Sequence, residues 1–119
     1  MSVSGNEIQS DPYEAYEDVE AAMEYLVANA ESLSIDASTF VMTGFSAGGH
    51  LAALYGTTCA VQYCPIAMVL HYPYMEAGAK IFCSQTGARW PQATGFDSCL
   101  PAAQVDTFTP PTVVYQGTD

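Results

Sequence analysis

The stretch Gly44-Phe45-Ser46-Ala47-Gly48 decides the fold of this chain, because it places a serine between two glycines where a strand is expected to turn into a helix. The preceding residues, Phe40-Val41-Met42-Thr43, are mostly apolar and half β-branched, which is typical of a short buried strand. The following residues, Gly49 to Tyr55, read as the first turns of a buried helix. We therefore expect Ser46 on a strained turn, with its hydroxyl pushed out of the sheet.

The residues on either side of the serine fit the chemistry of acyl transfer. Gly44 and Gly48 are expected to be needed because a Cβ there would collide with the neighbouring strand or helix. The N–H of Ala47 would point at the place where a tetrahedral oxyanion forms. The pattern predicts a nucleophile elbow around Ser46. A tight structural turn without chemistry is the alternative, since short patterns of this kind also arise by chance.

Composition predicts one domain and excludes some partners. The 119 residues include 13 acidic and 2 basic side chains, which gives a net charge of −11. Such a surface repels phosphate backbones and anionic lipids, so we expect neither a nucleic-acid nor a membrane partner. Nine of the 13 acids lie in residues 1–36, where there is no Lys or Arg. We interpret them as the solvated face of a helix, with a docking surface for a cationic partner as the alternative.

All four cysteines follow the elbow, without a C-x-x-C pair or a histidine cluster, so we expect no metal site and no cofactor. An even number of cysteines in loop-rich sequence suits two disulfides, such as Cys59–Cys64 and Cys83–Cys99, in an oxidising compartment. Reduced, buried thiols in a cytosolic enzyme are the alternative. The location therefore stays open between secreted and cytoplasmic, with secretion favoured if the cysteines pair.

A helix is expected from Pro12 to Glu31, begun by Asp11 as N-cap and Glu14 as the partner in a capping box. Apolar residues recur there every three or four positions, and glutamates occupy the remaining positions. The helix should therefore lie on a sheet with its acidic face in water. A turn at residues 34–38 should lead into the strand at residues 39–43.

Two further strands are expected beyond the elbow helix. Residues 66–72 form an apolar run that predicts a strand buried on both faces, ended by Pro73. Residues 112–115 predict a third short buried strand. Between them, from Tyr74 to about Asp106, no helical or strand period is sustained. Strands that alternate with helices predict an α/β fold with about three parallel strands, flanking helices and a long lid-like excursion.

The chain resembles the α/β-hydrolase superfamily, closest to its acetyl-esterase and xylan-esterase-like carboxylesterases. The matching segments are residues 16–22, 34–36, 44–52, 71–73, 110–112 and 116–119. The resemblance implies a three-layer core, Ser46 as nucleophile, the Ala47 N–H as one oxyanion donor, and Gly44 and Gly48 as elbow glycines. Asp119 is the candidate for the triad acid if the loop that carries it is shortened. Residues 74–108 would form a lid or an acyl or alcohol pocket.

The chain departs from the family pattern in two ways. No His-Gly-Gly loop for a second oxyanion donor is present, and the expected late triad histidine is missing. His50 lies on the elbow helix and is expected to pack there, and His71 is expected to be a near-surface histidine rather than the base. Residues 1–119 are therefore expected to be a partial hydrolase domain, without the N-terminal strands that carry the oxyanion loop and without the C-terminal base. Such a domain is a fragment or completes itself by association, as in a homo-oligomer.

Two functions follow from these observations. The first is a serine carboxylic-ester hydrolase, or part of one, that acts on small acyl esters, including esters on carbohydrate. Without a triad histidine the isolated chain should show little or no turnover. The alternative is a non-catalytic α/β-hydrolase-like module that associates through the open edge of its sheet.

Overall fold

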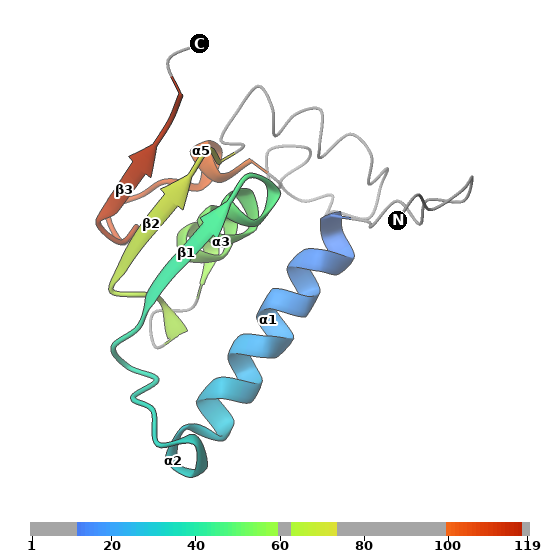
Figure 1. Ribbon diagram of the computed structural model, residues 1–119, viewed down its shortest axis with the longest axis vertical. Helices are drawn as coiled ribbons and strands as arrows, with labels where there is room; N and C mark the ends of the chain where they lie inside the picture. Colours follow the sequence, from blue (N-terminus) through green and yellow to red (C-terminus); the bar gives the residue numbers. More distant parts are fainter. Residues whose placement is uncertain (1–11, 60–62, 74–99, 118–119) are drawn as a thin grey trace, which may run out of the picture.

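The computed structural model describes residues 12–59, 63–73 and 100–117 (Figure 1). These residues form four helices and three strands. In chain order they are α1 (Pro12–Ala28), α2 (Ala30–Leu33), β1 (Val41–Phe45), α3 (Ala47–Thr58), β2 (Ala67–His71), α5 (Pro101–Gln104) and β3 (Thr112–Tyr115). No helix among the described residues is both long and apolar enough to cross a membrane.

The three strands form one open parallel sheet in the order β1-β2-β3. They lie side by side in Figure 1, and all three run in the same direction. The register pairs Phe45 with His71 and His71 with Tyr115, so the last residues of the three strands form one row. The expected α/β core with three parallel strands and flanking helices is confirmed.

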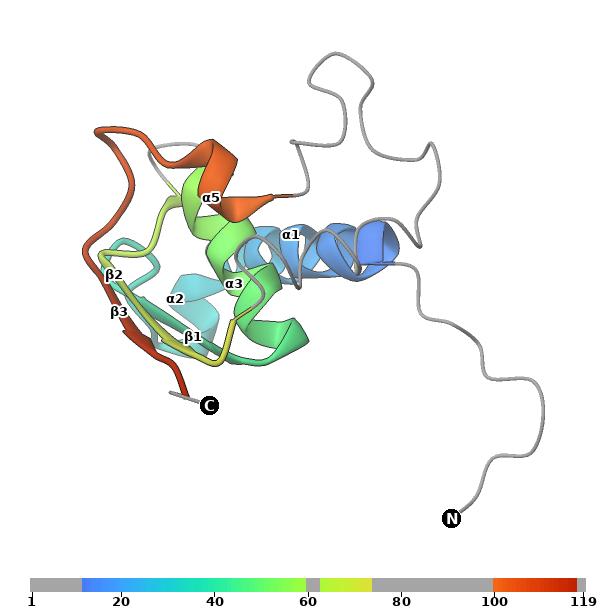
Figure 2. The same ribbon diagram turned by 90° about the horizontal axis from the view of Figure 1, so that it is seen from above.

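Helix α3 packs against one face of the sheet, and α1 and α5 pack against α3 (Figure 2). The core between helix and sheet consists of small and apolar side chains: Ala52, Ala53, Met68 and Leu70, with Met42 beside them. The Met68 side chain from β2 fills the space beside Gly56 of α3, where a Cβ would collide with its sulfur. A second cluster joins Leu54 of α3 to Leu100.

The opposite face of the sheet is not covered by any described helix. Val41, Phe45, Val113 and Tyr115 are each more than half exposed there. The predictions that residues 66–72 are buried on both faces and that β3 is buried are therefore wrong, since β2 alternates between buried and half-buried residues and β3 is exposed throughout. Of the three expected layers, the described residues form two. The apolar runs correctly predicted that these segments are strands. Whether a strand is buried on both sides depends, however, on what covers the second face of the sheet.

Helix α1 starts where the sequence predicts, whereas its N-cap, predicted at Asp11, lies outside the described residues. The predicted single helix to Glu31 is interrupted at Asn29, where α1 ends and the short helix α2 follows. The Asn29 side-chain amide donates to the Tyr25 carbonyl at 2.8 Å, as its backbone N–H does at 3.0 Å. An asparagine side chain that hydrogen-bonds to a nearby backbone carbonyl competes with the backbone hydrogen bonds of the helix. This explains the break at Asn29.

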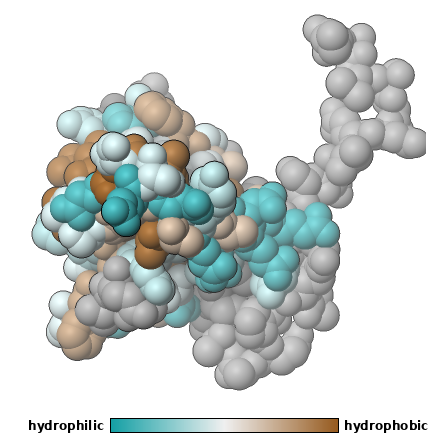
Figure 3. Space-filling view, turned by 90° about the horizontal axis from the view of Figure 1, so that it is seen from below, coloured by the Kyte–Doolittle hydropathy of each residue, from teal (hydrophilic) through white to brown (hydrophobic). Residues whose placement is uncertain are grey.

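The acidic side of α1 faces water, as predicted. The outward glutamates of α1, Glu17, Glu20 and Glu24, are exposed, and so is Glu31 on α2. Figure 3 shows hydrophilic residues along α1 and apolar residues over the side of the molecule that carries the sheet. On the inner side of α1, the Tyr16 hydroxyl lies 2.7 Å from that of Thr58, at the end of α3. Burial raises the pKa of Tyr16 to about 12.

A turn around Asp36 sets the start of β1. Its carboxylate accepts hydrogen bonds from the hydroxyl and N–H of Ser38, at 2.6 and 2.9 Å, and from the hydroxyl of Thr39 at 2.8 Å. These bonds, led by the Ser38 hydroxyl, lower the pKa of Asp36. Because Thr39 is held in this turn, β1 begins at Val41, two residues later than the sequence predicts.

A disulfide joins Cys59 to Cys64 in the loop between α3 and β2, with Cα atoms 5.3 Å apart. The first of the two predicted pairs is confirmed. The second, Cys83–Cys99, lies outside the described residues, as does most of the lid-like segment, residues 74–99.

Candidate active site

Ser46 lies between the last residue of β1 and the first residue of α3, at the carboxyl edge of the sheet. Its backbone has φ 52° and ψ −120°, a conformation that costs a non-glycine residue about 1–3 kcal/mol. Two hydrogen bonds hold the strained residue: its N–H donates to the His71 carbonyl at 2.9 Å, and its carbonyl accepts from the His50 N–H at 3.0 Å. The residue is exposed. The strained strand-to-helix turn expected from the sequence is therefore present.

Backbone hydrogen-bond donors gather next to Ser46. The first backbone bond within α3 runs from His50 to Ser46, so the N–H groups of Ala47, Gly48 and Gly49 have no carbonyl partner within the helix. The Ser46 hydroxyl makes no capping bond to them, and the first turn contains no acidic side chain. The positive end of the helix dipole adds to these donors. The arrangement can stabilise a negative charge that develops beside the serine oxygen.

The glycines of this turn differ in whether the surrounding atoms leave room for a Cβ. A Cβ on Gly44 would lie 2.3 Å from the Gly48 carbonyl oxygen, so the strand and the helix touch through their backbones. A Cβ on Gly48 meets no described atom within 4 Å, so the predicted collision there is wrong. Gly49 has the close contact instead, because a Cβ there would lie 3.2 Å from the Gly44 oxygen and from Pro73. Pro73 follows β2, and the sequence pattern around the serine contains no sign of this contact.

The two histidines occupy packing positions. His50 is completely buried within α3, which confirms the expectation that it packs in the interior.

The His71 ring stacks between Phe45 and Tyr115, with ring centres 4.3 and 4.9 Å away and planes within 10° of parallel. This aromatic row lies on the sheet face opposite α3, since Gly44 and Leu70, the neighbours of Phe45 and His71, are buried. His71 therefore contributes its carbonyl, rather than its ring, to the Ser46 turn.

Tyr72 is a residue of this edge that the sequence analysis did not single out as a candidate. It follows β2 with φ 51°, and its N–H donates to the Tyr115 carbonyl at 2.8 Å. Its side chain is more than half exposed. Ser46 and Tyr72 thus place two strained non-glycine residues at adjacent strand ends, the edge at which α/β sheets bind their ligands. The position of Tyr72 before Pro73 gave no signal of this conformation, because a residue before proline seldom has positive φ.

Asp119, the candidate triad acid, lies outside the described residues. The described residues contain no group of three or more His, Cys, Asp or Glu side chains placed to hold a metal ion.

The family model described as BD-FAE matches residues 10–76, which is more than half of the chain. The chain belongs to the BD-FAE family. This is an α/β-hydrolase-like esterase domain, so the superfamily expected from the sequence is confirmed. The match covers α1, β1, the Ser46 turn, α3 and β2. No curated protein and no solved structure gives a significant match to this BD-FAE chain.

Proposed function

We propose that this BD-FAE chain carries the nucleophile of a serine carboxylic-ester hydrolase, and that the nucleophile is Ser46. The observation that supports this is the combination of positive φ at an exposed serine with helix N-terminal amides directly after it. A purely structural turn would be less strained with glycine at this position, so the strain of a serine calls for a reason. Acyl transfer supplies that reason.

In the proposed reaction the Ser46 Oγ attacks the ester carbonyl carbon while a general base takes the hydroxyl proton. The carbonyl oxygen becomes an oxyanion that accepts a hydrogen bond from the Ala47 N–H. Collapse of this intermediate breaks the bond to the alcohol, which leaves with a proton and gives an acyl-enzyme. Water then attacks the acyl carbon, releases the carboxylic acid and restores the serine.

We propose small acyl esters as substrates, including esters on carbohydrate, and Asp119 as the triad acid. The resemblance to acetyl- and xylan-esterase-like enzymes supports this choice of substrate. Since His50 is buried in the helix and the His71 ring is stacked, turnover by the isolated chain should be slow. Loss of a triad member in serine hydrolases leaves only the acceleration that the oxyanion donors and substrate binding provide, about 10³–10⁴ over water.

A fluorophosphonate probe tests the nucleophile separately from turnover, because phosphonylation is a single step that gives a stable adduct and needs no release of an acyl group. We expect labelling of the wild type, none of Ser46→Ala, and unchanged labelling of Ser32→Ala, a matched control on α2. Mass spectrometry of the labelled peptide identifies the modified residue. A folded wild-type chain that does not react, or that reacts equally after Ser46→Ala, would overturn the proposal.

The alternative is a non-catalytic module that associates through the open edge of its sheet, and the uncovered sheet face next to that edge is the feature that adds to it. This face is about 14 Å wide, from three strands about 4.8 Å apart, and about 17 Å long. This amounts to roughly 240 Å², far below the ~800 Å² that each partner of a stable complex contributes. We therefore favour the esterase proposal over a module defined by this face.

A further inference from the structure

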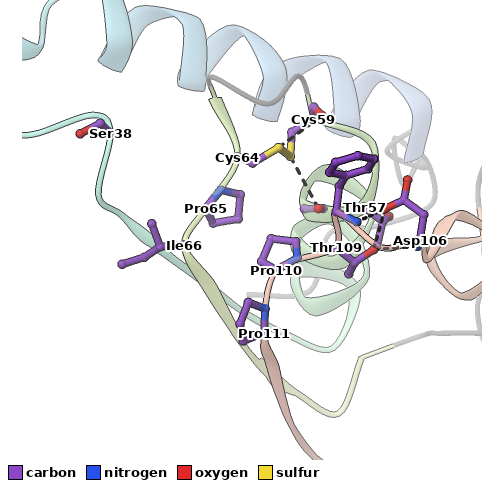
Figure 4. A pocket seen from close by; sticks show the side chains of 12 residues that line it. Ser38, Thr57, Cys59, Cys64, Pro65, Ile66, Asp106, Thr109, Pro110 and Pro111 are labelled. Atoms are coloured by element: carbon purple, nitrogen blue, oxygen red, sulfur yellow. Dashed lines mark hydrogen bonds between the residues drawn. A yellow bond between two sulfur atoms is a disulfide. The ribbon is translucent and has the colours of Figure 1, made fainter.

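A cavity of about 470 Å³ lies at the amino edge of the sheet, at the opposite ends of the strands from Ser46 (Figure 4). Its volume falls within the range of small-molecule sites. Residues that precede each strand line it, together with the end of α3 and the Cys59–Cys64 disulfide. The lining residues before the strands include Ser38, Ile66, Pro110 and Pro111.

The hydrogen-bond donors of this lining are already used within the protein. The Thr57 hydroxyl donates to the Ala53 and Leu54 carbonyls, and the Ser38 hydroxyl donates to Asp36. The Thr109 hydroxyl accepts from the Asp106 N–H at 2.9 Å and donates to Asp106 Oδ1. Three lining residues are prolines, which have no N–H. A ligand would therefore have to supply its own donors.

What the lining offers instead is negative charge. Asp106 uses Oδ1 for the Phe108 N–H and the Thr109 hydroxyl, and its Oδ2 takes part in none of the described hydrogen bonds. Gly56 and Thr57 belong to the last turn of α3, whose carbonyls form the negative end of the helix dipole. The described residues contain no Lys or Arg to neutralise this charge.

The remaining walls are apolar. In Figure 4, Pro65, Ile66 and the two prolines before β3 lie below the disulfide, and Asp106 lies beside Thr109 at one side of the cavity. Phe108 also lines the cavity and is 80% exposed, so its ring face is accessible to a ligand. An aromatic ring beside a carboxylate is a favourable environment for an organic cation.

We propose that this cavity binds a small organic cation, namely a primary ammonium group on an apolar body. The ammonium group donates to Asp106 and to the carbonyls at the end of α3 and lies against the ring face of Phe108, and the apolar body packs against the prolines. The proposal does not depend on the esterase activity, because the cavity and Ser46 lie at opposite edges of the sheet.

An NMR titration of the ¹⁵N-labelled full chain at fixed ionic strength tests the proposal. The probes are 2-phenylethylammonium, its neutral counterpart 2-phenylethanol and the anion phenylacetate. We expect the ammonium to bind about tenfold more tightly than the alcohol, the anion not to bind, and amide shifts to be confined to the lining residues. Equal binding of alcohol and ammonium, or shifts centred on α1, would overturn the proposal.

Two variants separate the local carboxylate from the net charge of the protein. Asp106→Asn keeps Oδ1 as the acceptor for the Phe108 N–H and should weaken ammonium binding about tenfold. Asp18→Asn, a matched control on the exposed side of α1, should change it less than twofold. Equal losses of ammonium affinity in the two variants would mean that the probe is attracted only by the net charge of the protein, and would overturn the proposal.

A third variant covers the case in which Asp106→Asn does not fold, which a thermal melt would reveal. Phe108→Leu keeps an apolar side chain but removes the aromatic ring. It should weaken the ammonium probe a few-fold and leave 2-phenylethanol unchanged. An equal loss for both probes would contradict a cation site.

Discussion

The two ends of α3 give the two edges of the sheet opposite chemistry. At the carboxyl edge the helix begins with strained backbone and amides that lack a partner within the helix, so Ser46 lies in a donor-rich environment. At the amino edge the same helix ends against a disulfide, prolines and Asp106, which form an acceptor-rich cavity. One twelve-residue helix can thus favour an anion at one end and a cation at the other.

The carboxyl edge depends on direct backbone contact, so a single methyl group should disrupt it. Gly44→Ala places a Cβ 2.3 Å from the Gly48 carbonyl oxygen, and neither backbone can move away easily. We expect a loss of more than about 3 kcal/mol in the free energy of unfolding, measured by urea denaturation.

Gly48→Ala is the matched control. The described residues leave room for its methyl group, and alanine favours helix over glycine by up to about 1 kcal/mol. Unfolding free energies that fall equally in the two variants would contradict the packing described for this turn.

The amino edge depends on a covalent link, so its disruption should be milder. The disulfide closes a loop with a sequence separation of 5, and replacing both Cys59 and Cys64 by serine should cost about 2 kcal/mol of stability. The same double variant should weaken binding of the ammonium probe, because the disulfide forms one wall of the cavity.

Fluorophosphonate labelling of Ser46 should be unchanged in this variant, as the serine lies at the other edge. Labelling that falls together with ammonium binding would show that the two edges are not independent.

The sequence was a reliable guide where the signal is local. Residues 112–115 of β3 were predicted with correct bounds, because a short run of β-branched and aromatic residues after two prolines marks a strand clearly. The turn at Ser46 was predicted from five residues, since glycine and serine there reflect backbone geometry. The Cys59–Cys64 pair was predicted from an even number of cysteines in loop-rich sequence.

Features that depend on distant parts of the chain could not be predicted. The contact of Gly49 with Pro73 arises only when β2 lies beside β1, and the sequence analysis assigned the steric role to Gly48 instead. Exposure of Phe45 and Tyr115 depends on what covers the second face of the sheet, which an apolar run does not reveal. The cavity combines residues 38, 56–57, 59, 64–66, 106 and 108–111, and no motif connects them.

The smallest expected effect is a difference in stability between two variants of Ser46. It tests whether the serine side chain strains the backbone of this turn. Ser46→Ala keeps a Cβ at φ 52° and so keeps the strain, whereas Ser46→Gly relieves it. After the entropy that glycine loses on folding, we expect the glycine variant to be about 1 kcal/mol more stable than the alanine variant. Both should be inert to the fluorophosphonate probe, and paired urea denaturations measure the difference. A glycine variant less stable than the alanine variant would mean that the Ser46 side chain does not strain the turn, and backbone strain would then no longer support acyl transfer by Ser46.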